Sequence, residues 1–408
     1  MVVAIPVEIA QAVTGYVGDK GSLANLVLVS HAFRRLAEPF LYSDVSFLVP
    51  LQRKHGGWGQ AEGRPDAVLS AMANTFLCGI TARGGVCARY VKRIYLPGAA
   101  FRGIQSFESI LQSTPNLEDL RVHRGWRAEF TLPLDFRGFF IGPPSQYSVP
   151  PFALKTFAWY TPDVELSAVG LGWFLSTQKS LECLLVPALD AEYESLLPIL
   201  PTFPRLRILH AATAHDAQMF SKASQVTYLM LDSCATELDA AAFSNTVVYV
   251  ARRSPLHEVS AAITHMPRLE YLEIYTDRCP IPQSLSQLRV LEGASKLRHL
   301  RFFPNQLLSE SQSFQSYPWD YEDVVNIFNI LPSLTHISVL ISPSTTNFTQ
   351  YCCFIKGMPR PVKLRARRPQ ASKDDLYEWW NDWIEDYLVV PFEASDPRMG
   401  YQGDLLSP

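Results

Sequence analysis

The chain has 408 residues and a formal net charge of −3, with 48% hydrophobic and 18% charged residues. This composition excludes a disordered chain and supplies enough apolar side chains for a large core. A nearly balanced charge gives no general attraction to nucleic acid or to anionic lipid, so we expect neither as a partner.

The first predicted element is a helix that begins at Pro6, a first-turn position where the missing N–H has no intrahelical partner. One apolar stripe with helical spacing follows and consists of Ile9, Val13, Tyr16 and Val17. Residues 18–21, Gly-Asp-Lys-Gly, predict a turn that ends this helix.

A second helix is predicted to begin at Ser22 as its N-cap and to continue to Leu36. Its apolar residues spread over more than half of its circumference and are Leu23, Leu26, Val27, Val29, Phe33 and Leu36. A hairpin of about forty residues cannot bury that much apolar surface by itself. The surplus predicts a neighbouring domain or another protein as its partner.

The spacing of these residues carries a family resemblance. The pattern Ile5-Pro6-x-Glu8-Ile9, then Leu26-x-x-Val29-Ser30-x-x-Phe33-Arg34-x-Leu36, resembles an F-box, and residues 37–47 resemble the exit strand of fungal F-box proteins. The resemblance implies docking to the Skp-type adaptor of cullin–RING ubiquitin ligases, and through it to a cullin scaffold. The implied adaptor-binding residues are Ile5, Pro6, Ile9, Leu26, Val29 and Phe33. The alternative is an ordinary helical hairpin packed on its own domain.

After the hairpin, residues 50–65 are rich in glycine and polar groups and predict a loop, followed by a helix from Pro65 to Thr81. A short motif then recurs: a hydrophobic residue, two free positions, a hydrophobic residue, one free position and a hydrophobic residue. It is typical of leucine-rich repeat strands. The nine copies are Val91-Ile94-Leu96, Leu117-Leu120-Val122, Leu154-Phe157-Trp159, Leu181-Leu184-Val186, Leu206-Leu209-Ala211, Val226-Leu229-Leu231, Leu269-Leu272-Ile274, Leu297-Leu300-Phe302 and Leu334-Ile337-Val339. The longest interval predicts one degenerate copy near Leu256.

Helices are predicted between the strands, at Phe107–Gln112, Glu165–Ser176, Tyr193–Leu200 and Tyr321–Leu331. One strand and one helix cannot bury their own apolar faces, so such units stack into a solenoid. We therefore expect an α/β protein with a parallel sheet on a concave face and helices on a convex face. The alternative is a globular α/β domain with a parallel sheet.

The end of the chain is predicted to close the solenoid. The basic run 363–368 predicts a solvated connector, with a nuclear import signal as the alternative. Ser372 and Asp375 form a capping box for an amphipathic helix. Its apolar stripe is Leu376, Trp379, Trp380, Trp383, Ile384, Tyr387 and Leu388, and its opposite face is acidic. Such a helix would cover the last repeat, although a partner-binding helix fits the same pattern.

The sequence contains no catalytic motif that we recognise, so we expect no enzyme activity, no metal and no cofactor. His257-Glu258 and His265 lack the i, i+4 spacing of a zinc helix, and Cys352-Cys353 would point to opposite sides of a strand. Seven cysteines without a paired framework indicate reduced thiols and a cytoplasmic or nuclear protein. No window is apolar enough to span a membrane.

Strand parity predicts where a substrate binds. If the motif residues point into the core, their neighbours point to the concave face. That face is predicted to carry Tyr228, Met230, Tyr271, Glu273, Tyr275, His299, Arg301 and Phe303. Aromatic, Met and Arg side chains are enriched at protein interfaces, which favours a protein substrate. Alternatively, the insertions 133–151 and 304–320 fold over this face and make these residues core.

The predicted organisation has four parts: an F-box at 1–48, a linker and connecting helix at 49–88, the leucine-rich-repeat-like solenoid at 89–345, and a connector with a capping helix at 346–408. The predicted function is a substrate-recognition adaptor of an SCF-type ubiquitin ligase. The first alternative is a leucine-rich-repeat interaction scaffold without a link to ubiquitination, and the second is an enzyme with an unrecognised site. No motif identifies the substrate.

Overall fold

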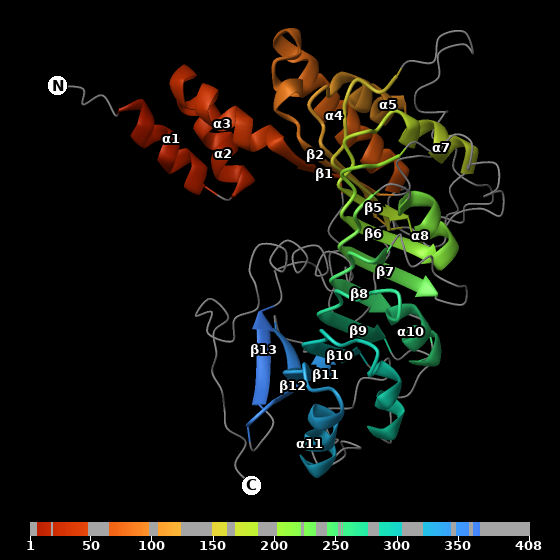
Figure 1. Ribbon diagram of the computed structural model, residues 1–408. Helices are drawn as coiled ribbons and strands as arrows, with labels where there is room; N and C mark the ends of the chain where they lie inside the picture. Colours follow the sequence, from red (N-terminus) through yellow and green to blue (C-terminus); the bar gives the residue numbers. More distant parts are fainter. Residues whose placement is uncertain are drawn as a thin grey trace. The chain divides into compact units, whose positions relative to one another are not determined.

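The computed structural model describes residues 6–17, 19–47, 65–97, 105–123, 149–160, 168–186, 202–221, 224–233, 243–251, 254, 256–275, 285–303, 321–343, 348–358 and 362–367. The chain divides into two compact units, Met1–Arg205 and Leu206–Pro408. In each unit helices alternate with strands of a largely parallel sheet, and strands adjacent in the chain pair with each other (Figure 1). The predicted α/β class and the repeat-like architecture are thereby confirmed.

The first unit begins with three helices, α1 (Val7–Tyr16), α2 (Lys20–Val29) and α3 (His31–Ser43). The predicted cap at Ser22 is wrong, because Asp19 caps α2 by accepting from the backbone N–H of Gly21 at 3.2 Å and of Ser22 at 2.7 Å. The predicted single helix to Leu36 is also wrong. Ser30 has extended backbone angles, and its hydroxyl accepts from the N–H of Phe33 at 3.2 Å, so it begins a new helix.

The helical module continues directly into the sheet. Strand β1 (Asp44–Ser46) follows α3 and pairs in parallel with β2 (Arg93–Pro97). The Lys92 N–H donates to the Ser43 carbonyl, and the Phe47 N–H donates to the Tyr95 carbonyl, both at 2.9 Å. The last strand of the segment 1–48 is thus also the first strand of the repeat sheet.

Helix α4 (Pro65–Gly85) confirms the helix predicted from Pro65 to Thr81, because its backbone leaves helical geometry at Ala82. Arg83 has a φ of 53°, which is uncommon for a residue with a side chain. Gly84 and Gly85 also have positive φ, and a short 3-10 helix, η1 (Cys87–Tyr90), follows. This break turns the chain from α4 toward β2.

The first unit continues with α5 (Gln105–Ser113), β3 (Asp119–His123), β4 (Thr156–Tyr160), α7 (Ala168–Ser176) and β5 (Cys183–Val186), and its described strands pair in parallel in chain order. The second unit contains β6 (Ile208–Thr213), α8 (Ala214–Ser221), β7 (Tyr228–Ser233), β8 (Val248–Ala251), α10 (Leu256–Ile263), β9 (Tyr271–Tyr275), η4 (Leu285–Leu291), β10 (His299–Phe303), α11 (Tyr321–Ile330) and β11 (His336–Pro343). Strands β6 to β11 are parallel, and β12 (Phe348–Ile355) and β13 (Val362–Arg367) continue the sheet in antiparallel fashion.

All nine predicted repeat motifs form strands. In every copy the second and third residues lie in the strand, the first lies just before it, and each of these side chains is at most 1% exposed. Helices α5, α7 and α11 confirm three of the predicted helices. The motif face packs against helices, as Phe157 of β4 does against Phe174 of α7 with ring centroids 5.2 Å apart. This layer is the core.

The degenerate copy lies at Thr246-Tyr249-Ala251 and not near Leu256, where α10 begins. All three side chains are fully buried, as in the regular copies. Thr246 follows Val226 by 20 residues and precedes Leu269 by 23, so both intervals suit the repeat. A polar first residue hid this copy from a search for hydrophobic triplets.

The C-terminal part differs from the prediction. The run predicted as a solvated connector at 363–368 contains most of strand β13, which pairs with β12 from Cys353–Val362 to Phe348–Arg367. The predicted capping helix from Ser372 and the helix at Tyr193–Leu200 lie outside the described residues. Within the described part of the chain, no helix has the length and hydropathy that a membrane span requires.

Candidate functional site

The N-terminal helices expose large apolar side chains. Helix α1 turns Ala10 and Thr14 inward, where the Thr14 hydroxyl donates to the Ala10 carbonyl at 2.7 Å. Its larger apolar residues point outward, as do the last residues of α2. We call this set the N-terminal apolar surface, and it consists of Val7, Ile9, Val13, Tyr16, Leu28 and Val29. Helices α1 and α2 each pack against α3, so one module carries the whole set.

The residues implied as adaptor-binding are distributed unevenly. Ile9 is 55% exposed and Val29 is 66% exposed, and Pro6 is exposed at the start of α1. Leu26 and Phe33 are half-buried, and Ile5 lies outside the described residues. Val7, Val13, Tyr16 and Leu28 are also exposed and are not among the implied residues. The helical spacing of Val13 and Tyr16 with Ile9 was the signal for two of them.

The module is fixed to the first repeats by side chains as well as by backbone. Glu38 on α3 is buried and accepts two hydrogen bonds from the Arg83 guanidinium, at 2.9 and 3.0 Å. Phe47 meets Phe76 of α4 and Phe107 of α5 edge-to-face, with ring centroids 5.4 and 5.0 Å apart. The Glu38–Arg83 ion pair and the ring contacts of Phe47 therefore fix the orientation of α3 relative to α4 and α5.

The predicted substrate residues lie together on the sheet face opposite the repeat motifs. Register places Tyr228, Val248, Tyr271, His299 and His336 in one row across β7 to β11. The next row holds Met230, Val250, Glu273, Arg301 and Ser338. Tyr275 and Phe303 are also register partners. Strand parity therefore brings this set together.

The side chains on this face are more buried than those of an unoccupied binding surface would be. Tyr228, Met230, Tyr271 and Glu273 are buried, whereas Tyr275, His299 and Arg301 are intermediate. The exposure of Phe303 lies outside what the structure describes. The burial favours the alternative in which these side chains are core, and substrate binding on this face stays a prediction.

A polar network joins several of these side chains. The Tyr271 hydroxyl donates to Glu273 Oε2 at 3.1 Å, and Arg301 Nη1 lies 3.7 Å from the same oxygen. The Arg301 guanidinium also lies 5.4 Å from the centroid of the Tyr271 ring. His299 stacks on His336 with ring centroids 4.7 Å apart. The network is a buried structural feature with two titratable rings at its edge.

These histidines predict a pH dependence of stability. Burial, and then the nearby His336 and Arg301 charges, lower the pKa of His299 from 6.5 to about 3, and burial also lowers the pKa of His336. Because these pKa values are lower in the folded state, the unfolded chain binds more protons in acid. The free energy of unfolding is therefore highest above pH 6.5 and falls as the pH drops toward 3. His299 alone should contribute a slope of about 1.4 kcal/mol per pH unit in that window. Urea unfolding between pH 7 and 5 measures it, and His299→Gln should flatten the profile; an equal slope in both proteins would contradict this assignment.

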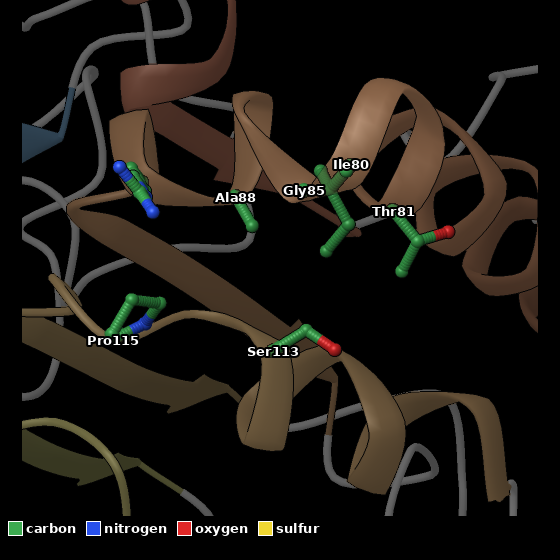
Figure 2. A pocket seen from close by; sticks show the side chains of 8 residues that line it. Ile80, Thr81, Gly85, Ala88, Ser113 and Pro115 are labelled. Carbon is green, nitrogen blue, oxygen red and sulfur yellow. The ribbon is translucent and has the colours of Figure 1, made fainter.

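The described residues also form a pocket of about 360 Å³ between the end of α4, η1 and the turn after α5. Figure 2 shows Ile80, Thr81, Gly85 and Ala88 facing Ser113 and Pro115 across it. Arg89 is the charged side chain in this lining, and the Thr81 hydroxyl already donates to the Leu77 carbonyl at 2.7 Å. The lining holds no acid–base pair and no activated nucleophile.

The described residues offer no metal site, and the Cys353 thiol is buried. No group of three His, Cys, Asp or Glu side chains there is arranged to hold a metal ion. Cys353 is buried on β12 with its Sγ 3.2 Å from the Ser338 hydroxyl, and burial raises the pKa of its thiol to about 11. This thiol stays protonated near neutral pH and is a poor nucleophile.

Comparison with protein-family models found no match, and comparison with curated protein sequences found none either.

Proposed function

We propose that this protein is a substrate-recognition subunit of an SCF-type ubiquitin ligase. The N-terminal helices dock to a Skp-type adaptor, the adaptor connects them to a cullin scaffold, and the repeats bind a protein substrate. The observation that carries the proposal is the N-terminal apolar surface, where Ile9, Tyr16 and Val29 point away from the chain's own core. Contiguous helices that expose this much apolar area indicate a site for another protein.

The connection between module and sheet supports the same role. A subunit that presents a substrate for modification at a second protein must hold both at a defined separation. Here the module is joined through β1, the Glu38–Arg83 pair and Phe47, so its orientation on the first repeats does not depend on a free linker.

A second candidate function is an interaction scaffold in which the helices only cap the sheet. The pairing of β1 with β2 favours it, because the module then completes the first edge of a repeat array, which needs a cap. A cap uses only inward-facing side chains. The exposed residues of α1 distinguish the two candidates, since only the ligase subunit requires them.

Co-expression with a Skp-type adaptor tests the proposal. We expect the two proteins to copurify through an affinity tag on this chain and to elute as one stoichiometric complex in size-exclusion chromatography. A folded chain that elutes alone in the presence of excess adaptor would reject the ligase role and leave the scaffold.

A further inference from the structure

An apolar groove lies between α11 and the end of β12. Its walls are Val324, Val325 and Phe328 on the helix and Phe354, Ile355 and Met358 on the strand and the following turn. Val325 is 37% exposed and Met358 is 44% exposed, although both are large apolar side chains. Gly357, which has a φ of 85° and belongs to the turn after β12, also lines the groove.

The size of the groove favours side chains over a small molecule. Its volume is about 200 Å³, below the roughly 300–1,000 Å³ of most small-molecule sites. A groove of this kind, formed by a helix and a strand, accommodates large side chains presented along one face of another helix. An amphipathic segment with large apolar residues at helical spacing is the matching occupant.

We propose that this groove binds the chain's own segment 376–388, which then closes the last repeat. Its apolar stripe contains Trp379, Trp380 and Trp383, and its sequence has the period of an amphipathic helix. Residues 368–408 lie outside the described part of the chain. The inference is independent of the ligase role, because it concerns the opposite end of the chain.

The length of the connecting chain permits this contact. Strand β13 ends at Arg367, which is the register partner of Phe348 at the start of β12, whereas the groove lies at the other end of β12. The seven steps from Phe348 to Ile355 span about 24 Å at strand geometry. The nine steps from Arg367 to Leu376 reach about 30 Å when extended. The connector is therefore long enough to reach the groove when it is nearly extended.

Charge is also complementary. The segment is acidic on its polar side, with Glu378, Asp382, Glu385 and Asp386, and Asp375 directly precedes it. The cation at the groove is Lys356, which is exposed and donates to the Pro332 carbonyl at 2.6 Å. A carboxylate beside this fixed ammonium group would orient the segment along the groove.

Hydrogen–deuterium exchange on the full-length protein tests the proposal. Peptides covering 376–388 should exchange at least about tenfold more slowly than the same synthetic peptide free in solution. Val325→Asp should remove that protection, and Met358→Asp should do so from the other wall. Val290→Asp is the matched control, because Val290 is 42% exposed on η4 of the same unit and does not line the groove. Conversely, Trp383→Ala should speed the exchange of α11.

Three outcomes would overturn the proposal. Residues 376–388 of the native protein could exchange at the free-peptide rate, which would mean that the groove is not occupied by this segment. Protection could be equal in Val325→Asp, Met358→Asp and Val290→Asp, with unchanged exchange in β6 to β9 showing that the fold is intact. Protection could also disappear on dilution, which would assign the groove to a second copy of the chain.

Discussion

Replacing Ile9 and Val29 together with aspartate should abolish binding to a Skp-type adaptor and leave the melting temperature nearly unchanged. Both side chains are more than half exposed, so the folded monomer loses little. Fully burying an exposed side chain of this size contributes about 1.5–3 kcal/mol, and somewhat more than half of each surface remains to be buried. The loss of this apolar contact alone should therefore weaken the adaptor complex by about 2–3.5 kcal/mol, or roughly 30- to 300-fold in Kd. Buried carboxylates without a partner would increase the loss.

Isothermal titration calorimetry with purified adaptor measures this effect. The matched control is Val86→Asp with Val149→Asp, because both valines are exposed in the same unit but lie outside the N-terminal helices. The control pair should bind like the native protein. If both pairs bind equally well, the adaptor does not contact the N-terminal apolar surface, and the helices are a cap.

The repeat strands could be predicted because a short motif of neighbouring residues is enough to identify each one. Each copy places one apolar residue just before a strand and two within it, and every one of those 27 side chains is buried. The copy that begins at Thr246 could not be found from such a motif. A threonine whose hydroxyl lies 3.4 Å from the Val226 carbonyl can occupy a core position, and a hydrophobicity pattern does not represent that contact.

Helix boundaries in the N-terminal module were less predictable. Asp19 and Ser22 are both good caps, and the choice between them depends on which oxygen reaches free N–H groups. Ser30 is surrounded by helix-forming residues, so only its extended backbone reveals the break. A basic run predicts a solvated segment, so strand β13 was not predicted. Pairing with β12 satisfies the backbone hydrogen-bonding groups of β13 whatever charge its side chains carry.

The proposed docking residues come in part from the family resemblance, which does not predict how exposed they are. A stripe of Ile9, Val13 and Tyr16 fits either a core-facing or a partner-facing helix. Only the packing of the small Ala10 and Thr14 against the module shows which face is inside. On the predicted substrate face, strand parity placed Tyr271 and Glu273 correctly in rows, but it did not predict that both side chains are buried.

Phe47→Ala should be the most destabilising single change at the junction of module and repeats. Phe47 is 2% exposed and is held between the rings of Phe76 and Phe107. Removing a buried aromatic ring of this kind costs about 3–5 kcal/mol. For a unit of this size, the melting temperature should fall by on the order of 10 °C.

Phe40→Ala is the matched control, because Phe40 belongs to the same module, is 39% exposed and loses the same atoms. Differential scanning calorimetry should show a shift several times smaller for Phe40→Ala than for Phe47→Ala. Hydrogen exchange should show faster opening of α3 and α4 together in Phe47→Ala, because the two helices share the Glu38–Arg83 pair as well as this ring cluster. If α3 opens without α4, or if the two variants melt alike, the module is an appended element, and its orientation on the first repeats is not set by Phe47.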